Sequence, residues 1–153
     1  MENLFLEVLD RSTERLIQRQ RALYEAEGPF IAKWRTAMGY LDADFAAGYP
    51  KIVAELEALG WNRPELRARI VRRNRLWREV LTEAFTKAMA DYGLSPEQFP
   101  LEVMVALAMT FQRGIFAERL IGVKDGHDAL LAWIDAWLVA LEEGRSDARP
   151  GTQ

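Results

Sequence analysis

The segment from Leu101 to Gly144 constrains the fold more than any other part of this chain. Between Val103 and Met109 every residue is apolar, so a helix there has no polar side for about two turns. After a glycine-containing turn, residues 127–144 place their large apolar side chains within an arc of roughly 160° when mapped at about 100° per residue. A chain of 153 residues can hardly cover two such helices by itself. We therefore expect a central helical hairpin that also packs against a second copy of the chain.

The rest of the chain also repeats its apolar residues at helical spacing, with glycine and proline between the segments. Six main helices are predicted, over residues 2–26, 29–47, about 52–60, about 63–92, 101–121 and 127–144. Asn62 and Glu65 are spaced as a capping box at the start of the long helix, and Gly93 is expected to close it. No segment alternates as a strand does. The predicted fold is an all-α, multi-helix bundle with a single domain over residues 1–144 and a disordered tail over residues 145–153.

The composition argues against several classes of protein. A net charge of -3 and a pI near 5.3 disfavour a nucleic-acid surface on the domain as a whole. The chain has no cysteine, so it has no disulfide framework and no thiolate chemistry. Its N-terminus lacks the basic flank and apolar run of a secretory signal, and no apolar run approaches the roughly 20 residues that span a bilayer. We expect a cytoplasmic protein that makes no membrane contact.

Residues that could carry catalysis or hold a metal ion are scarce. His127 is the only histidine, and Lys124 precedes it by three positions, so the Glu-x-x-His pairs of di-iron bundles are absent. No nucleophile has an evident base partner, and no glycine-rich phosphate loop occurs. We therefore expect no enzyme, no cofactor and no metal site. His127 is interpreted as a turn or capping residue, with a ligand contact or a pH sensor as the alternative.

Two further features admit both a structural and a functional interpretation. Gly114 stands inside a predicted helix, where glycine costs roughly 1 kcal/mol relative to alanine. It indicates either the close approach of a neighbouring helix or room for a bound molecule. The long helix carries arginines that are spread around much of its circumference, so we expect a solvated face that pairs with acidic neighbours, with phosphate binding or protein docking as the alternative. These arginines are Arg63, Arg67, Arg69, Arg72, Arg73, Arg75 and Arg78.

Three of the long helices each carry a bulky side of aromatic residues and methionine. Taken singly, each of these residues suits a plain core. Taken together, such surfaces can enclose a cavity of about 300–1,000 Å³, and methionine adapts readily to ligands of varied shape. Thr110 and Gln112 are the nearest polar candidates for ligand contacts. The predicted ligand-binding residues are Trp34, Met38, Trp77, Leu81, Phe85, Met104, Ala108 and Phe111.

Three segments, taken in order, carry a resemblance to a known family. They are Glu2-Asn-Leu-Phe-Leu-Glu-Val-Leu9; Pro64-Glu-Leu66 followed by Arg72, Arg75 and Leu76-Trp77; and residues 106–115 followed by 130–144. The first is similar to a Lys-Glu-x-Leu-Phe pattern that opens the ligand domain of TetR-family (tetracycline-repressor-like) transcriptional regulators. The others resemble the long middle helix and the last two helices of that domain. Across about 140 residues, the chain resembles the C-terminal domain of this family.

The resemblance implies a ligand pocket among the middle helices and homodimerisation through the last two, which would form a four-helix interface. It also implies that the three-helix DNA reader is absent from this chain, so DNA would be contacted only through a helix-turn-helix domain outside it. The lack of polar surface on the last two helices points to the same interface. The predicted dimer residues are Phe116, Leu120, Leu130, Trp133, Ile134, Trp137, Leu138 and Leu141.

Two functions follow from these observations. The first is an effector-binding and dimerisation domain of a TetR-like regulator, in which a small apolar or aromatic molecule shifts the domain between conformations. The second is a stand-alone helical protein that binds a small molecule or acts as an adaptor and has no DNA-binding activity. The identity of the ligand is not encoded in any motif of the sequence.

Overall fold

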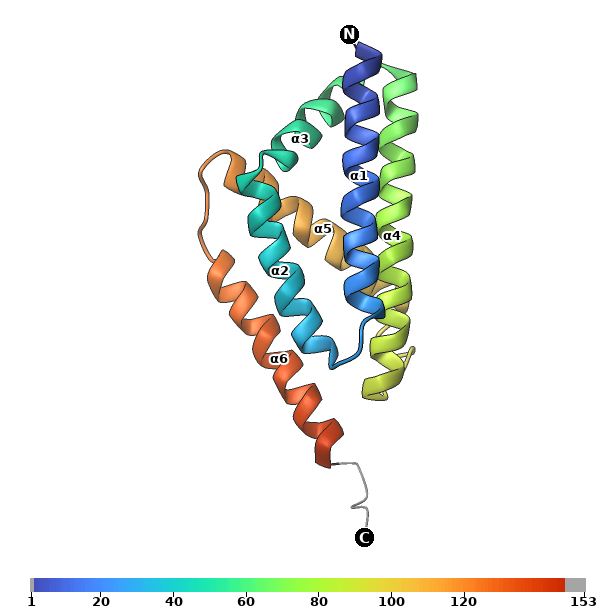
Figure 1. Ribbon diagram of the computed structural model, residues 1–153. Coiled ribbons are helices and arrows are strands. Elements are labelled where there is room, and N and C mark those ends of the chain that lie inside the picture. The colour runs from blue at the N-terminus through green and yellow to red at the C-terminus, as the bar shows by residue number, and fades with distance from the viewer. Residues whose placement is uncertain (1, 148–153) are drawn as a thin grey trace.

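The computed structural model describes residues 2–147, which form six α-helices and, within that range, no strand (Figure 1). The all-α class predicted from the sequence is therefore confirmed. The helices are α1 (Glu2–Glu25), α2 (Phe30–Ala46), α3 (Tyr49–Gly60), α4 (Pro64–Tyr92), α5 (Leu101–Leu120) and α6 (His127–Asp147). No helix in the described range combines the length and the apolar character that crossing a membrane requires.

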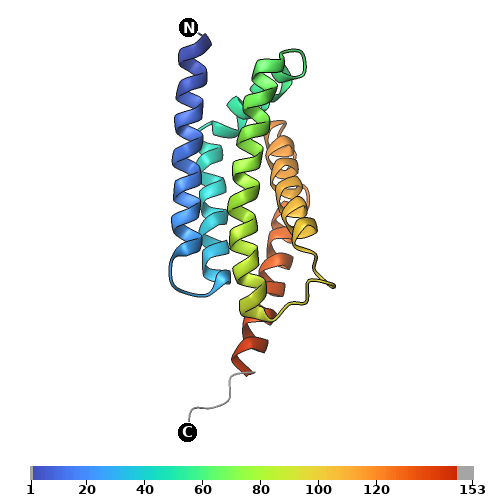
Figure 2. The ribbon, with the colours of Figure 1, turned by 90° about the vertical axis from the view of Figure 1, so that its right-hand side faces the viewer.

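The two longest helices, α1 and α4, pack side by side and run in the same direction, while α2 returns antiparallel to α1 (Figures 1 and 2). The short helix α3 carries the chain from α2 across to the start of α4 (Figure 1). Leu6, Leu56 and Leu66 form a compact buried cluster where α1, α3 and α4 meet, with Leu9 and Ile52 packed against it. This solid core lies at one end of the molecule, beside the N-terminus of α1.

The last two helices do not form the expected central hairpin. Helix α5 packs mainly against α4, whereas α6 packs against α2 and α4, and α5 and α6 have few contacts with each other. Their apolar sides nevertheless remain uncovered in part, since Val103 and Leu107 on α5 and Trp133 on α6 are more than half exposed.

Of the two capping signals predicted for α4, the structure has the glycine cap at the C-terminal end and lacks the capping box at the N-terminal end. Gly93 takes the left-handed conformation at φ 64°, and the N–H of Leu94 donates to the carbonyl of Met89 at 2.9 Å, as a glycine C-cap requires. The capping box predicted at Asn62 and Glu65 is wrong, because Arg63 is the N-cap and no side chain caps the helix. Pro64 stands in the first turn, where its missing N–H costs nothing.

Helix α6 continues through Asp147, past the predicted boundary at residue 144. The remainder of the predicted tail, residues 148–153, lies outside the described residues.

Some of the arginines of α4 pair with acidic neighbours as expected. Arg69 donates to Asp10 of α1 at 2.8 Å, and Arg73 donates to Glu57 of α3 at 2.8 Å. Arg67 instead donates through Nε to the carbonyl oxygen of Gly60 at 3.2 Å. A side chain at position 60 would meet Ile70 at 2.5 Å, so the glycine allows the end of α3 to lie directly on α4.

A bidentate ion pair joins α2 to α6 at the solvent-exposed side of their contact. Nε and Nη2 of Arg35 donate to the two carboxylate oxygens of Asp135 at 2.7 and 2.8 Å. Hydrogen bonds from Arg35 lower the pKa of Asp135 below its ordinary value of 3.8. The pair therefore contributes to stability only while Asp135 is ionised.

We predict that Asp135→Asn lowers the melting temperature at neutral pH by no more than about 3 °C, because exposed ion pairs contribute little. A carboxylate with a lowered pKa stabilises the folded state above its unfolded value of 3.8, and this contribution is lost as the pH falls through the lowered pKa. The difference between wild type and variant should thus shrink in thermal melts as the pH falls below 3.8, and vanish where Asp135 is protonated in the folded state too. Asp128→Asn, at an exposed position of the same helix, is the control. A difference that persists in acid would contradict the assignment.

Candidate ligand-binding site

A cavity of about 630 Å³ lies among α1, α2, α4, α5 and α6 and is lined mainly by aromatic and aliphatic side chains. Its volume falls within the range of about 300–1,000 Å³ that is usual for small-molecule sites. All eight residues predicted to bind a ligand border this one cavity. They are Trp34 and Met38 on α2, Trp77, Leu81 and Phe85 on α4, and Met104, Ala108 and Phe111 on α5. That they bind a ligand remains a prediction.

The residues predicted for a dimer interface also lie against cavities of the single chain. The six on α6 border the large cavity: Leu130, Trp133, Ile134, Trp137, Leu138 and Leu141. The two on α5, Phe116 and Leu120, border a smaller pocket, and Phe116 stacks on Phe45 at a ring-centroid distance of 6.2 Å. Leu138 is only 4% exposed, so it offers a partner no free surface, whereas Trp133 is 68% exposed. Of these residues, the exposed ones alone can carry the predicted interface.

Burial divides the lining of the large cavity into a floor and a rim. The floor consists of fully buried residues on α2 and α4, among them Ala37 and Val80. The rim consists of the exposed residues Leu107 on α5 and Leu130 and Trp133 on α6. The side of the cavity formed by α5 and α6 is therefore the side more exposed to solvent.

Four aromatic rings meet at one part of the cavity wall. Phe30 stacks on Tyr24 at a centroid distance of 6.0 Å and meets Phe85 and Tyr92 edge-on at 6.1 and 6.5 Å. Such stacked and edge-to-face contacts are favourable arrangements of aromatic rings. Burial raises the pKa of Tyr24 to about 12, so its hydroxyl stays neutral throughout the physiological range.

Polar groups in the cavity come from residues that the sequence analysis did not single out. Gln20 and Tyr24 on α1 and Tyr92 on α4 border it, whereas Thr110, one of the two expected candidates, is exposed and lies outside it. Gln112, the other candidate, does border it. The position of Gln20 on the buried stripe of α1, four residues before Tyr24, is the signal that could have identified it.

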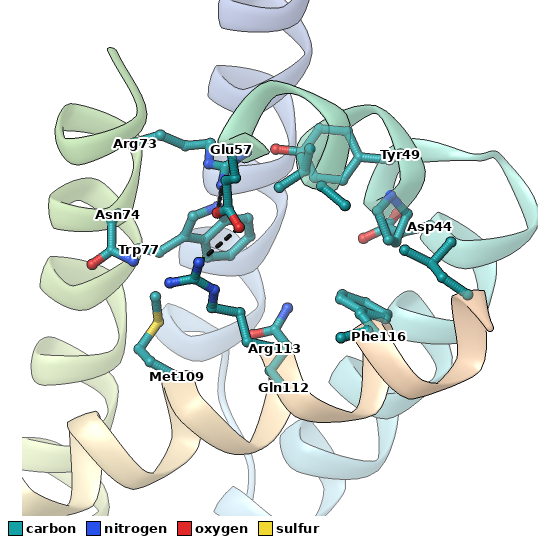
Figure 3. A pocket seen from close by; sticks show the side chains of 15 residues that line it. Asp44, Tyr49, Glu57, Arg73, Asn74, Trp77, Met109, Gln112, Arg113 and Phe116 are labelled. Carbon is teal, nitrogen blue, oxygen red and sulfur yellow. Dashed lines mark hydrogen bonds and ion pairs between the residues drawn. The ribbon is translucent and has the colours of Figure 1, made fainter. Parts of the chain in front are cut away.

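A smaller pocket of about 230 Å³ adjoins the large cavity and is lined by both charged and apolar side chains (Figure 3). The carboxylate of Glu57 accepts hydrogen bonds from Arg73 at 2.8 Å and from Arg113 at 2.7 Å. Trp77 and Gln112 border both spaces and so belong to the wall between them. The cluster joins α3 to α4 and α5, and Nη1 of Arg73 is buried without a hydrogen-bond partner among the described residues.

The only histidine lies away from both cavities, at the first residue of α6. His127 is 5% exposed, and its Nε2 lies 2.5 Å from Oε2 of Glu118 on α5. This position at a helix start agrees with its interpretation as a turn residue. Among the residues that the structure describes, no group of three histidine, aspartate or glutamate side chains could hold a metal ion.

Comparisons with protein-family models, with curated proteins and with solved structures gave no match to this chain. The resemblance to the TetR family therefore remains a prediction that rests on the sequence motifs and their order. The interpretation of the site rests on the residues that line the cavity.

Replacing Ala108 by phenylalanine is an experiment that distinguishes a ligand cavity from a close-packed core. We expect Ala108→Phe to fill space, to keep or raise the melting temperature, and to abolish uptake of the apolar dye N-phenyl-1-naphthylamine. In a close-packed core the same change would destabilise the fold by about 1–3 kcal/mol. Ala90→Phe, at an exposed position of α4, should leave dye uptake unchanged. Destabilisation by Ala108→Phe would count against the cavity.

Proposed function

We propose that this chain is the effector-binding and dimerisation domain of a TetR-like transcriptional regulator, and that it senses a small apolar or aromatic molecule. The observation that carries the proposal is the cavity of about 630 Å³ with its nearly continuous apolar lining. Its volume lies in the range that is usual for small-molecule sites, so it can hold a molecule of that class. Any contact with an operator would belong to a helix-turn-helix domain outside the printed sequence.

The lining indicates how strongly such a molecule would bind. Burying roughly 300 Å² of apolar ligand surface contributes at most about 7 kcal/mol before the costs of ordering the complex. That corresponds to dissociation constants in the micromolar range or weaker. Affinity would come mainly from burial, so molecules of similar shape would compete for the same space.

Helix α6 offers a way for the ligand to act on the rest of the protein. It supplies six lining residues and packs mainly against α2 and α4. A ligand that contacts both α6 and the floor would favour one position of α6 over others, and a shift of this kind requires such a difference in affinity. In a dimeric regulator, the movement would change the spacing of attached DNA-reading domains and hence their fit to half-sites one helical turn apart.

A second copy of the chain is the proposed partner of the exposed apolar sides of α5 and α6. On α5 this side follows helical spacing through Val103, Leu107 and Gly114, all exposed. No atom lies within 4 Å of a side chain built at Gly114, so its small size has no explanation within the single chain. On α6, exposed alanines flank Trp133. Small residues let helices approach closely, which suits helix-to-helix contact between two copies.

The alternative is a stand-alone helical protein that binds a small molecule or serves as an adaptor. It shares the cavity with the first proposal but requires neither the second copy nor an attached DNA reader. The two functions therefore differ in the oligomeric state that they require.

The ligand-binding part of the proposal predicts that the purified chain takes up small neutral molecules. Native mass spectrometry should detect a co-purifying molecule, or the stripped protein should bind N-phenyl-1-naphthylamine with a micromolar dissociation constant. Competition by other aromatic compounds should follow their size. If the protein carries nothing and takes up no dye at about 100 µM, this part of the proposal fails.

The dimer part predicts that the wild-type chain is a dimer at micromolar concentration and buries about 2,000 Å² or more in total. The double change Leu107→Glu with Trp133→Glu places carboxylates on exposed positions of α5 and α6, so it should yield a folded monomer in light scattering. Trp61→Glu changes an equally exposed tryptophan at the end of α3 and should leave the dimer intact. A monomeric wild-type chain would favour the stand-alone alternative.

A further inference from the structure

We infer that the preferred ligand of the large cavity carries one carboxylate, which Gln112 and Arg113 of α5 bind where that cavity meets the small pocket. This inference rests on the proposed ligand-binding function and adds the chemical class of the effector. That class is an amphipathic anion, with an apolar or aromatic body and a single carboxylate at one end. Neutral molecules of the same shape also enter the cavity, but they bind more weakly.

The large cavity and the small pocket meet at the side chains of Trp77 and Gln112, which border both spaces. On α5, Phe111 borders only the large cavity and Arg113 borders only the small pocket. A molecule that extends along this part of α5 therefore passes from an apolar space into one that contains charged side chains.

The amide of Gln112 is available to a ligand at this junction. Gln112 is half-buried, no residue that the structure describes hydrogen-bonds to its side chain, and neither of its polar atoms is among those buried without a partner. The amide therefore keeps accessible surface, and its N–H groups can donate to a carboxylate oxygen. Because no hydrogen bond holds it, the side chain can also turn aside for a molecule that occupies both spaces.

Arg113 supplies accessible charged donors next to Gln112 (Figure 3). Its Nη2 donates to Oε2 of Glu57 at 2.7 Å, yet its side chain remains 63% exposed. A guanidinium has several N–H donors, so those that Glu57 does not use are open to a ligand. Charge-assisted hydrogen bonds from arginine to a carboxylate are shorter and stronger than neutral ones.

The charged side chains around the small pocket have an excess of one positive charge. Those that line it are Asp44, Glu57, Arg73 and Arg113. Both carboxylate oxygens of Asp44 accept hydrogen bonds from Arg19, and the carboxylate of Glu57 is shared between Arg73 and Arg113. Three guanidiniums thus face two carboxylates, and a carboxylate on the ligand would balance the charge. Since Arg73 is largely buried, the exposed Arg113 is the partner that the ligand reaches.

The large cavity determines where the other end of the ligand lies. No charged side chain among the described residues borders it, and burying a charge without a partner is strongly unfavourable. The carboxylate is therefore held at the junction, and the apolar body stays in the large cavity. The whole chain has a net charge of -3, so it has no general attraction for anions, and a preference for an anion would be local to this site.

Two probes of nearly equal shape test the inference: 6-phenylhexanoate, which is an anion at neutral pH, and 6-phenylhexanamide, which is neutral. Each has an aromatic body and a flexible arm that carries the polar group away from it. Their affinities are measured by displacement of N-phenyl-1-naphthylamine, with the affinity of the dye determined for each variant. The wild-type protein should bind the carboxylate about tenfold more tightly than the amide, and this preference should shrink as the salt concentration rises.

Arg113→Met removes the charge and keeps an extended side chain, so it should abolish the preference and leave the affinity for the amide unchanged. Arg113→Lys keeps the charge and should retain part of the preference. The control is Arg72→Met, which removes an exposed arginine of α4 that borders neither space. It changes the net charge equally and should leave both affinities unchanged.

If Arg113→Met fails to fold, the wild-type preference and its dependence on salt still decide whether the site selects an anion. Equal binding of the two probes, tighter binding of the amide, or a preference that survives Arg113→Met would overturn the inference and leave the ligand cavity standing. Failure of both probes to displace a dye that does bind would overturn it as well. If neither the probes nor the dye bind, the proposed ligand-binding function itself fails.

Discussion

The large cavity depends on apolar walls that do not meet one another. Helices α2 and α4 border it with large rings such as Trp34 and Trp77, and α6 borders it with Trp133 and Trp137. Large rings from opposite walls border the same space without filling it. Since close packing is the usual state of a protein interior, the stability that a filled centre would provide must come from elsewhere in this fold.

Part of that stability comes from contacts at the edges of the cavity. The leucine cluster around Leu56 closes one end of the molecule, and Glu57 joins α3 to α4 and α5 through its two arginines. Arg35 and Asp135 join α2 to α6. Arg119 near the end of α5 donates to Asp42 of α2 at 2.7 Å. These ion pairs join the helices around the cavity, although an exposed pair contributes little to stability by itself.

The proposed function uses both parts of this arrangement. Buried residues of α2 and α4 form the floor of the cavity, and α6 provides a wall held by fewer neighbours. Binding energy that comes from apolar burial is not selective, so the proposed site would accept molecules of varied structure.

The sequence by itself determined the helices and the faces they bury. Periodicity is a local property, so it predicted the all-α class, most helix boundaries and the glycine cap at Gly93, and it placed the eight predicted cavity residues on the inner sides of their helices. The expectation of a capping box at Asn62 failed because Arg63 took the N-cap position instead. Periodicity shows which residues share a face of one helix but not which helix that face will meet. Only the tertiary structure decided that α5 and α6 pack apart rather than as a hairpin, that Leu138 is buried within the chain itself, and that Gln20 borders the cavity. Each of these outcomes depends on competition among surfaces that are far apart in the sequence.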